Sequence, residues 1–114
     1  MANATEFTNL DIEHLRQQLK HWVIQRNFQT IHTPKNLMLA LVGEIGELAE
    51  CLQWKSEGQN GKLEFSAHEY VHLGEELSDV LIYLIRLSDE CGINLTEAVF
   101  RKIKLNSQKY PCNQ

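Results

Sequence analysis

The sequence contains few of the residues that mark specialised classes of protein. Its 114 residues include two prolines and six glycines, far fewer than a collagen or a low-complexity linker has. Its three cysteines, Cys51, Cys91 and Cys112, form no Cys-x-x-Cys pair, which argues against a disulfide framework or a thiolate zinc site. The longest apolar runs, such as residues 37–42 and 80–85, are six residues long, whereas a membrane span needs about 20. We therefore expect no membrane-spanning helix.

An excess of positive charge is also missing. The chain has 11 Lys and Arg residues against 15 Asp and Glu residues, giving a net charge of −4, so we expect no binding to polymeric nucleic acid. The first nine residues lack the basic and then apolar order of a secretory signal, which predicts a cytoplasmic protein with reduced thiols. The length predicts one domain over residues 1–114, in which we expect residues 1–8 to be flexible.

Apolar residues recur at spacings of three and four in four segments, which predicts an all-α fold. The prolines and the glycine-rich segment 56–61 separate these segments. The predicted helices cover residues 8–27, 34–55, 66–91 and 94–110. We expect the second and third helices to be antiparallel neighbours within a four-helix unit that is completed by oligomerisation.

Capping signals support these boundaries. Thr8 with Asp11, and Ser66 with Glu69, have the spacing of a capping box, and Gly92 follows the third helix as a C-cap glycine would. The fourth helix opens at Asn94 with Glu97 three residues later. The faces predicted to point inward are Ile12, Leu15, Leu19, Trp22 and Val23; Leu37, Leu41, Ile45, Leu48 and Leu52; Leu73, Leu77, Val80, Leu84 and Leu87; and Leu95, Val99 and Ile103.

Two acid-x-x-acid pairs are the most informative feature of the sequence. Glu44 and Glu47 lie on the second predicted helix, and Glu76 and Asp79 lie on the third. Residues three apart on a helix are neighbours, so each pair places two carboxylates on one side. Facing pairs would repel each other unless a cation lay between them, and hard oxygen ligands suit Mg²⁺ or Mn²⁺ better than Zn²⁺. The alternative is a non-catalytic helical module that dimerises or binds metal through an acidic surface.

A competing motif lies at the start of the third predicted helix. Residues 68–72 match His-Glu-x-x-His, in which His68 and His72 would bind zinc in a peptidase. Against this interpretation, Glu69 already has a predicted capping role, and no predicted strand is available to hold a peptide substrate. We therefore favour the oxygen-ligand site over a zinc peptidase.

The segments that carry the acid pairs resemble the MazG-like all-α nucleoside triphosphate pyrophosphohydrolases, and within them the dCTP pyrophosphatase branch. The resemblance covers residues 32–37, 41–50, 53–55, 75–83 and 106–111. It implies Mg²⁺-dependent hydrolysis of (deoxy)nucleoside triphosphates at the α-phosphorus, with Mn²⁺ able to substitute. The products would be a nucleoside monophosphate and pyrophosphate, dCTP would be a candidate substrate, and the role would be cleaning of the nucleotide pool. A homodimer or homotetramer is also implied.

The same resemblance implies roles for individual residues. The metal ligands would be Glu44, Glu47, Glu76 and Asp79, and the general base would be Glu47 or Glu50. The base and sugar would be surrounded by Phe28, His32, Trp54 and Tyr83, and Asn36 would be a further substrate-binding residue. The phosphates would meet Lys102, Asn106, Lys109 and Tyr110.

Overall fold

The computed structural model describes residues 5–55, 58 and 63–112. Its elements are four helices: α1 (Ile12–Gln25), α2 (Pro34–Gln53), α3 (Ala67–Glu90) and α4 (Leu95–Lys109). The all-α prediction is therefore confirmed. Most of the predicted glycine-rich separator, and the first half of the segment expected to be flexible, lie outside the described residues. In the described part, no helix has the length and hydropathy that crossing a membrane requires.

The start of α1 differs from the prediction. The helix begins at Ile12, and residues 5–10 before it are not helical. Asp11 is the N-cap, because its carboxylate accepts a hydrogen bond of 2.9 Å from the backbone N–H of His14. The predicted Thr8 cap is therefore wrong: a capping side chain acts three residues ahead of its donor, and Asp11 holds that position.

The other predicted caps are confirmed. The Ser66 hydroxyl accepts from the backbone N–H of Glu69 at 3.1 Å, and the Glu69 carboxylate accepts from that of Ser66 at 2.9 Å. Asn94 caps α4. Gly92 follows α3 with a φ of 69°, a left-handed conformation that glycine adopts without strain.

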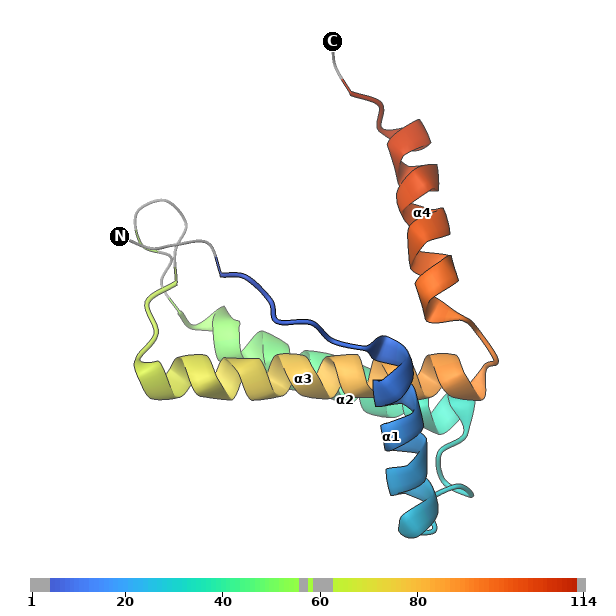
Figure 1. The fold of residues 1–114 in the computed structure, drawn as a ribbon. Helices are drawn as coiled ribbons and strands as arrows, with labels where there is room; N and C mark the ends of the chain where they lie inside the picture. Colours follow the sequence, from blue (N-terminus) through green and yellow to red (C-terminus); the bar gives the residue numbers. More distant parts are fainter. Residues whose placement is uncertain (1–4, 56–57, 59–62, 113–114) are drawn as a thin grey trace.

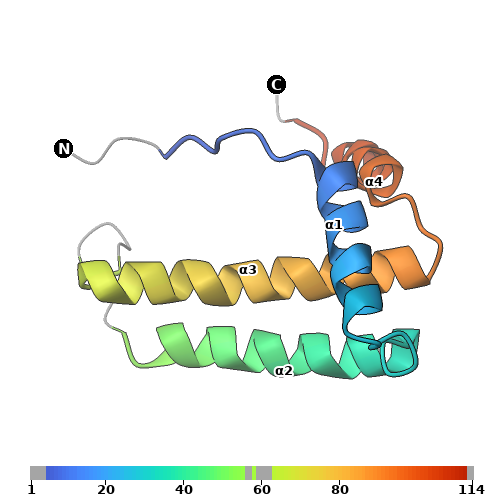
Figure 2. The ribbon, with the colours of Figure 1, turned by 60° about the horizontal axis from the view of Figure 1, so that its bottom comes forward.

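Helices α2 and α3 lie side by side and antiparallel, as predicted, and form a long hairpin (Figure 2). Helix α1 crosses α3 near the C-terminal end of that helix (Figure 2). Helix α4 turns away after α3 and projects from the hairpin (Figure 1). The chain thus builds one helical hairpin with a third helix across it and a fourth helix extending outward.

The buried apolar core is small. Val23, Leu37, Leu41 and Ile85 are buried. The first three were predicted to face inward, whereas the prediction for α3 chose Leu84, which is 38% exposed. Helix α3 packs against both α1 and α2, and Ile85 is the apolar side chain of α3 that is buried instead.

Helix α4 has no buried residue. Val99 and Ile103, which were predicted to point inward, are 45% and 55% exposed, and Phe100 is 69% exposed. The prediction for this helix is wrong for a single chain because α4 projects away from the hairpin and finds no apolar surface there (Figure 1). An apolar surface therefore remains on α4.

Candidate functional site

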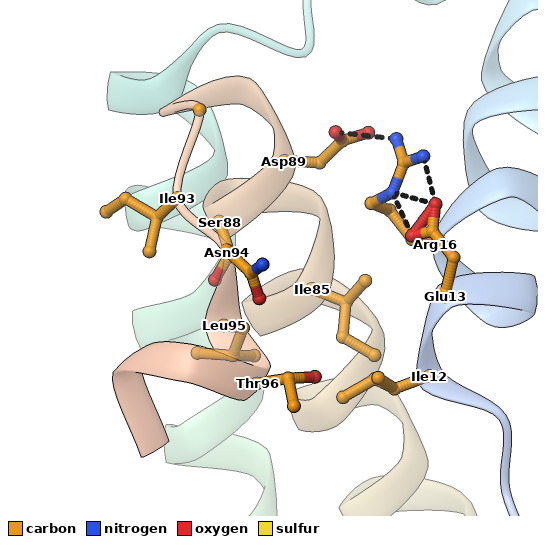
Figure 3. Close-up of a pocket in the computed structure, with 11 residues that line it drawn as sticks. Ile12, Glu13, Arg16, Ile85, Ser88, Asp89, Ile93, Asn94, Leu95 and Thr96 are labelled. Atoms are coloured by element: carbon orange, nitrogen blue, oxygen red, sulfur yellow. Dashed lines mark hydrogen bonds and ion pairs between the residues drawn. The ribbon is translucent and has the colours of Figure 1, made fainter. Parts of the chain in front are cut away.

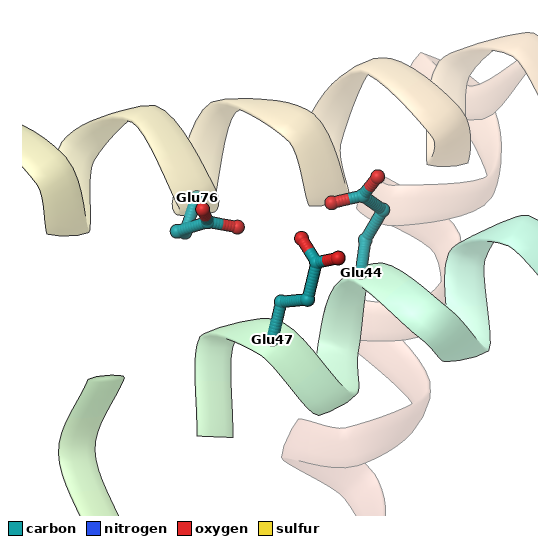
Figure 4. Close-up of side chains that lie close together, drawn as sticks. All are labelled: Glu44, Glu47 and Glu76. Atoms are coloured by element: carbon teal, nitrogen blue, oxygen red, sulfur yellow. The ribbon is translucent and has the colours of Figure 1, made fainter. Parts of the chain in front are cut away.

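Three glutamates converge at the middle of the hairpin. Glu44 and Glu47 extend from α2 toward Glu76 of α3 (Figure 4). One carboxylate oxygen from each residue lies within 4.8 Å of the other two. The i, i+3 spacing puts the first two side chains on the face of α2 that meets α3, and the antiparallel arrangement places Glu76 opposite them. We call Glu44, Glu47 and Glu76 the acidic cluster.

The electrostatics of the acidic cluster favour a bound cation. One oxygen of Glu44 and one of Glu76 are buried without a hydrogen-bond partner. Burial raises the pKa of Glu44, and the charges of Glu47, Asp79 and Glu76 raise it further. The pKa of Glu76 is also raised, first by burial and then by the charge of Glu47, while His72 acts in the opposite direction. A divalent cation would offset both the burial and the repulsion, and its preference for carboxylate oxygens fits Mg²⁺ or Mn²⁺.

Asp79, the fourth predicted ligand, is not one of the three converging side chains. Its charge nevertheless raises the pKa of both Glu44 and Glu76, so its carboxylate lies nearby. An aspartate is one methylene shorter than a glutamate, which keeps its carboxylate closer to its own helix. The structure therefore brings together three of the four predicted ligands and places the fourth beside them.

One groove opens beside the acidic cluster between the C-terminal half of α2 and the N-terminal half of α3. It has a volume of about 570 Å³. The residues that line it are Glu47, Glu50, Cys51, Trp54, Lys55, Phe65, Glu69, His72 and Glu76. The groove thus brings together two predicted general-base candidates, Glu47 and Glu50, and Trp54, which is 85% exposed. We call this space the α2–α3 groove.

The His-Glu-x-x-His segment does not form a zinc site in the described part of the chain. Glu69 accepts from Ser66 and pairs with Lys55, and its pKa is lowered to about 2, first by the hydrogen bond from Lys55. His72 faces acidic neighbours, with its Nε2 3.6 Å from an oxygen of Glu76. Among the described residues, the one group suited to a metal is the acidic cluster, which contains neither His68 nor His72.

A second cavity, of about 480 Å³, lies between α1, the loop that follows it, and α3. Its lining consists of Leu19, Trp22, Val23, Phe28, Ile31, His32, Asp79, Ile82, Tyr83 and Arg86. Three predicted base-binding residues, Phe28, His32 and Tyr83, therefore share one cavity. The rings of Phe28 and His32 are stacked with centroids 6.1 Å apart, and the ring of Trp22 meets that of Phe28 edge-on at 5.6 Å. We call this space the aromatic cavity.

The acidic cluster borders the α2–α3 groove through Glu47 and Glu76, and Asp79, one helical turn after Glu76, borders the aromatic cavity. Trp54 is consequently separated from the other predicted base-binding residues. Asn36 lines neither space: its side-chain amide donates to the carbonyl of Ile31 at 3.0 Å and so holds the loop that carries His32.

The predicted phosphate-binding residues are not brought to the acidic cluster within one chain. They are Lys102, Asn106, Lys109 and Tyr110. All four are exposed, and they lie on or directly after α4, which projects away from the hairpin (Figure 1). The Lys109 ammonium lies 5.4 Å from the ring centroid of its neighbour Tyr110.

A third cavity, of about 530 Å³, lies where α1, the end of α3 and the start of α4 meet (Figure 3). Arg16 spans its edge, donating to Glu13 at 2.8 Å and to Asp89 at 3.0 Å. Ile12 and Ile85 contribute apolar surface. None of the predicted site residues lines this cavity, so we do not assign it to the site.

Sequence reasoning missed Arg86. This residue is 2% exposed and lines the aromatic cavity. The sequence did contain a signal for this residue, because Arg86 is the one charged residue within the otherwise apolar residues 80–87. An arginine buried with such neighbours needs a paired partner, since arginine is almost never fully buried unless it is paired.

Fold and site together define a class: a small all-α protein in which two antiparallel helices bring together carboxylates that suit a divalent cation. The chain belongs to the MazG-like family, whose sequence profile matches residues 40–114. The family resemblance seen in the sequence is therefore confirmed.

Two curated relatives illustrate the similarity. Human dCTP pyrophosphatase 1 is 44% identical over 102 residues, which cover 90% of this chain and 60% of that protein. Mouse dCTP pyrophosphatase 1 is 45% identical over 100 residues, covering 88% of this chain and 59% of that protein. The chain thus spans about three fifths of the length of these relatives.

Solved structures show the same fold. A pyrophosphatase from Archaeoglobus fulgidus aligns with a TM-score of 0.71 and 33% identity, covering 96% of this chain and 100% of that one. The iMazG protein from Vibrio DAT 722 aligns with a TM-score of 0.60 and 26% identity, covering 90% of this chain and 100% of that one.

Proposed function

We propose that the protein hydrolyses nucleoside triphosphates at the α-phosphorus, releasing a nucleoside monophosphate and pyrophosphate. The observation that carries this proposal is the acidic cluster with its buried and unpartnered carboxylate oxygens, beside which Asp79 lines a cavity rich in aromatic rings. The names of the relatives support the choice of reaction, and dCTP is the first candidate substrate. The role would be removal of unwanted or excess nucleotides in the cytoplasm.

We propose that Glu44, Glu47 and Glu76 hold Mg²⁺, with Asp79 as a fourth ligand or a neighbouring charge. The bound ion would neutralise phosphate charge and lower the pKa of a water molecule. Glu50 is exposed and lies in the same groove as Glu47 without belonging to the acidic cluster. We therefore favour Glu50 over Glu47 as the base that takes the proton as water attacks the α-phosphorus and the bond to the pyrophosphate oxygen breaks.

We propose that the nucleobase enters the aromatic cavity. Phe28, His32 and Tyr83 line it, and flat aromatic surfaces stack on any nucleobase. Asp79 lines the same cavity and lies beside the acidic cluster, so a nucleotide whose base is in the cavity can extend its phosphates toward the metal. Trp54, in the α2–α3 groove, would contact a different part of the substrate.

We propose that a second copy of the chain completes the site in a homodimer or homotetramer. Lys102 and Lys109 lie on a helix that projects away from the acidic cluster of its own chain, and that helix exposes Val99, Phe100 and Ile103. Covering this apolar surface with a second copy would bury it and could bring the basic residues to another chain's metal site. Mixing an inactive Glu47→Gln chain with an inactive Lys109→Ala chain should then restore activity, whereas the absence of recovery in mixed oligomers would place both residues in one chain's site.

The reaction itself is tested by incubating the protein with each natural deoxynucleoside triphosphate and Mg²⁺, then separating the products by ion-exchange chromatography. We expect a monophosphate and pyrophosphate in equal amounts, and no products after a chelator is added. A diphosphate with orthophosphate would contradict cleavage at the α-phosphorus. Metal binding without turnover of any nucleotide would favour the non-catalytic metal-binding module.

A further inference from the structure

The buried Arg86 guanidinium is not used by the reaction proposed above. It lies on α3, three residues after Tyr83, and lines the aromatic cavity together with His32. Burial of an arginine requires compensation for the lost hydration of its charge. For Arg86 this compensation comes from hydrogen bonds to Asp89, Glu90 and His32.

Two carboxylates fix the guanidinium in place. One terminal nitrogen of Arg86 donates to Asp89 at 3.2 Å and the other donates to Glu90 at 2.7 Å. Asp89 also accepts a 3.0 Å hydrogen bond from Arg16 of α1, so the crossing helix helps to hold the arrangement. These ion pairs occupy both ends of the planar guanidinium and leave its Nε–H free for a third partner.

The third partner is the imidazole of His32. The Arg86 Nε–H donates to the Nδ1 of His32 over 3.4 Å, across 54 residues of sequence. A guanidinium only donates hydrogen bonds and stays charged, so Nδ1 must be the accepting nitrogen. A neutral imidazole whose Nδ1 accepts carries its hydrogen on Nε2.

The surroundings also keep the imidazole neutral. Burial lowers the pKa of His32, the positive charge of Arg86 lowers it further, and Glu90 acts in the opposite direction. The ring is stacked on Phe28, which restricts its rotation. The aromatic cavity is therefore lined by an imidazole whose remaining polar group is an Nε2–H donor.

We infer that Arg86 is a positioning residue that fixes His32 as its Nε2–H tautomer, so that the aromatic cavity favours a ligand offering a hydrogen-bond acceptor. A carbonyl oxygen or an unprotonated ring nitrogen of a nucleobase is such an acceptor. Only this identification of the ligand rests on the proposed function, because the tautomer itself follows from the contacts within the chain.

The tautomer is tested without any substrate by long-range ¹H–¹⁵N NMR of the His32 imidazole. We expect the wild-type ring to be neutral near pH 7 with its hydrogen on Nε2. Arg86→Lys retains the positive charge beside Asp89 and Glu90 but lacks an Nε–H, so we expect a mixture of both tautomers with unchanged helical circular dichroism. A wild-type His32 that is protonated or carries its hydrogen on Nδ1 would overturn the inference, and this result needs no variant that folds.

The effect on binding is tested with a double-mutant cycle in steady-state kinetics. Arg86→Lys should raise the KM for the preferred nucleotide about three- to tenfold, the value of one neutral hydrogen bond, with little change in kcat. In a His32→Gln background the same change should have almost no further effect. Lys20→Met is the matched control, because Lys20 lies 4.0 Å from Glu90 but does not line the aromatic cavity.

The outcomes are distinguishable. Equal effects of Arg86→Lys in both backgrounds would show that Arg86 acts only on the fold and would overturn the inference. A wild-type protein that turns over no nucleotide would refute the proposed function, while the NMR result would still decide the tautomer.

Discussion

Replacing Glu44 with glutamine should have opposite effects on stability with and without Mg²⁺. Glutamine has the shape of glutamate but lacks its charge, so the change removes one negative charge from the acidic cluster and leaves the packing intact. One oxygen of Glu44 is buried without a partner, and a carboxylate oxygen of this residue lies within 4.8 Å of oxygens of Glu47 and Glu76. Without metal, the charge therefore destabilises the folded chain.

The size of the effect can be worked out from these distances. Two unit charges at this separation repel by about 3.5 kcal/mol at an effective dielectric constant near 20. Solvent screening of the exposed Glu47 and partial protonation reduce the net gain to about 1 kcal/mol. A gain of that size should raise the Tm of the metal-free protein by about 4 °C. With Mg²⁺ at 100 times its Kd, wild type should gain about 2.7 kcal/mol, most of which the variant should lose.

Thermal unfolding followed by circular dichroism, in chelator and in Mg²⁺, tests this reasoning. The order of the two Tm values should reverse between the two conditions. Glu75→Gln is the matched control, because it makes the same change in charge on α3 at a side chain that is 70% exposed and outside the acidic cluster. A Glu44→Gln variant that is less stable in chelator, or that Mg²⁺ stabilises as much as wild type, would refute a cation site at this cluster.

Three further predictions follow from the fold and the site. The pKa values of Glu44 and Glu76 are raised above their usual 4.5 in the folded state, so the metal-free protein should lose stability as the pH rises from 4.5 through the raised pKa values. The double variant Glu44→Gln, Glu76→Gln should lose less stability over the same pH range when unfolding is measured as a function of pH. Phe28→Ala should raise KM several-fold with little change in kcat, and if Trp54→Ala has the larger effect in the same kinetic assay, the nucleobase binds in the α2–α3 groove instead. Asp11→Ala should lower the free energy of unfolding by about 1 kcal/mol in urea titrations through loss of the α1 cap, whereas an unchanged value would show that this hydrogen bond contributes nothing.

The arrangement of α4 bears on how the site is completed. The predicted phosphate-binding residues and the apolar Val99, Phe100 and Ile103 share a helix that extends away from the rest of its chain. A single chain therefore presents the carboxylates and the aromatic cavity but not the basic residues. The subunit-mixing experiment addresses this division directly, since it asks whether two chains contribute to one site.

Features that depend on local spacing could be predicted from the amino-acid sequence. The capping box of Ser66 and Glu69 needs residues three apart, and the helices follow from apolar repeats of three and four, so both could be predicted without any tertiary contact. The acid pairs are local as well. Their convergence at Glu44, Glu47 and Glu76 could be anticipated because consecutive amphipathic helices of a small bundle commonly pack antiparallel.

Which distant residues meet depends on the packing of the helices and could not be predicted from the sequence. The crossing of α1 over α3 creates the aromatic cavity, and it brings His32 to the buried Arg86, 54 residues away. Trp54 lies apart from Phe28 and Tyr83, in the α2–α3 groove, although the sequence resemblance grouped all three. Neither helical periodicity nor residue spacing contains the angle at which one helix crosses another or the direction in which α4 leaves the hairpin. Those depend on the packing of side chains from segments far apart in the chain, and that packing is a property of the folded molecule.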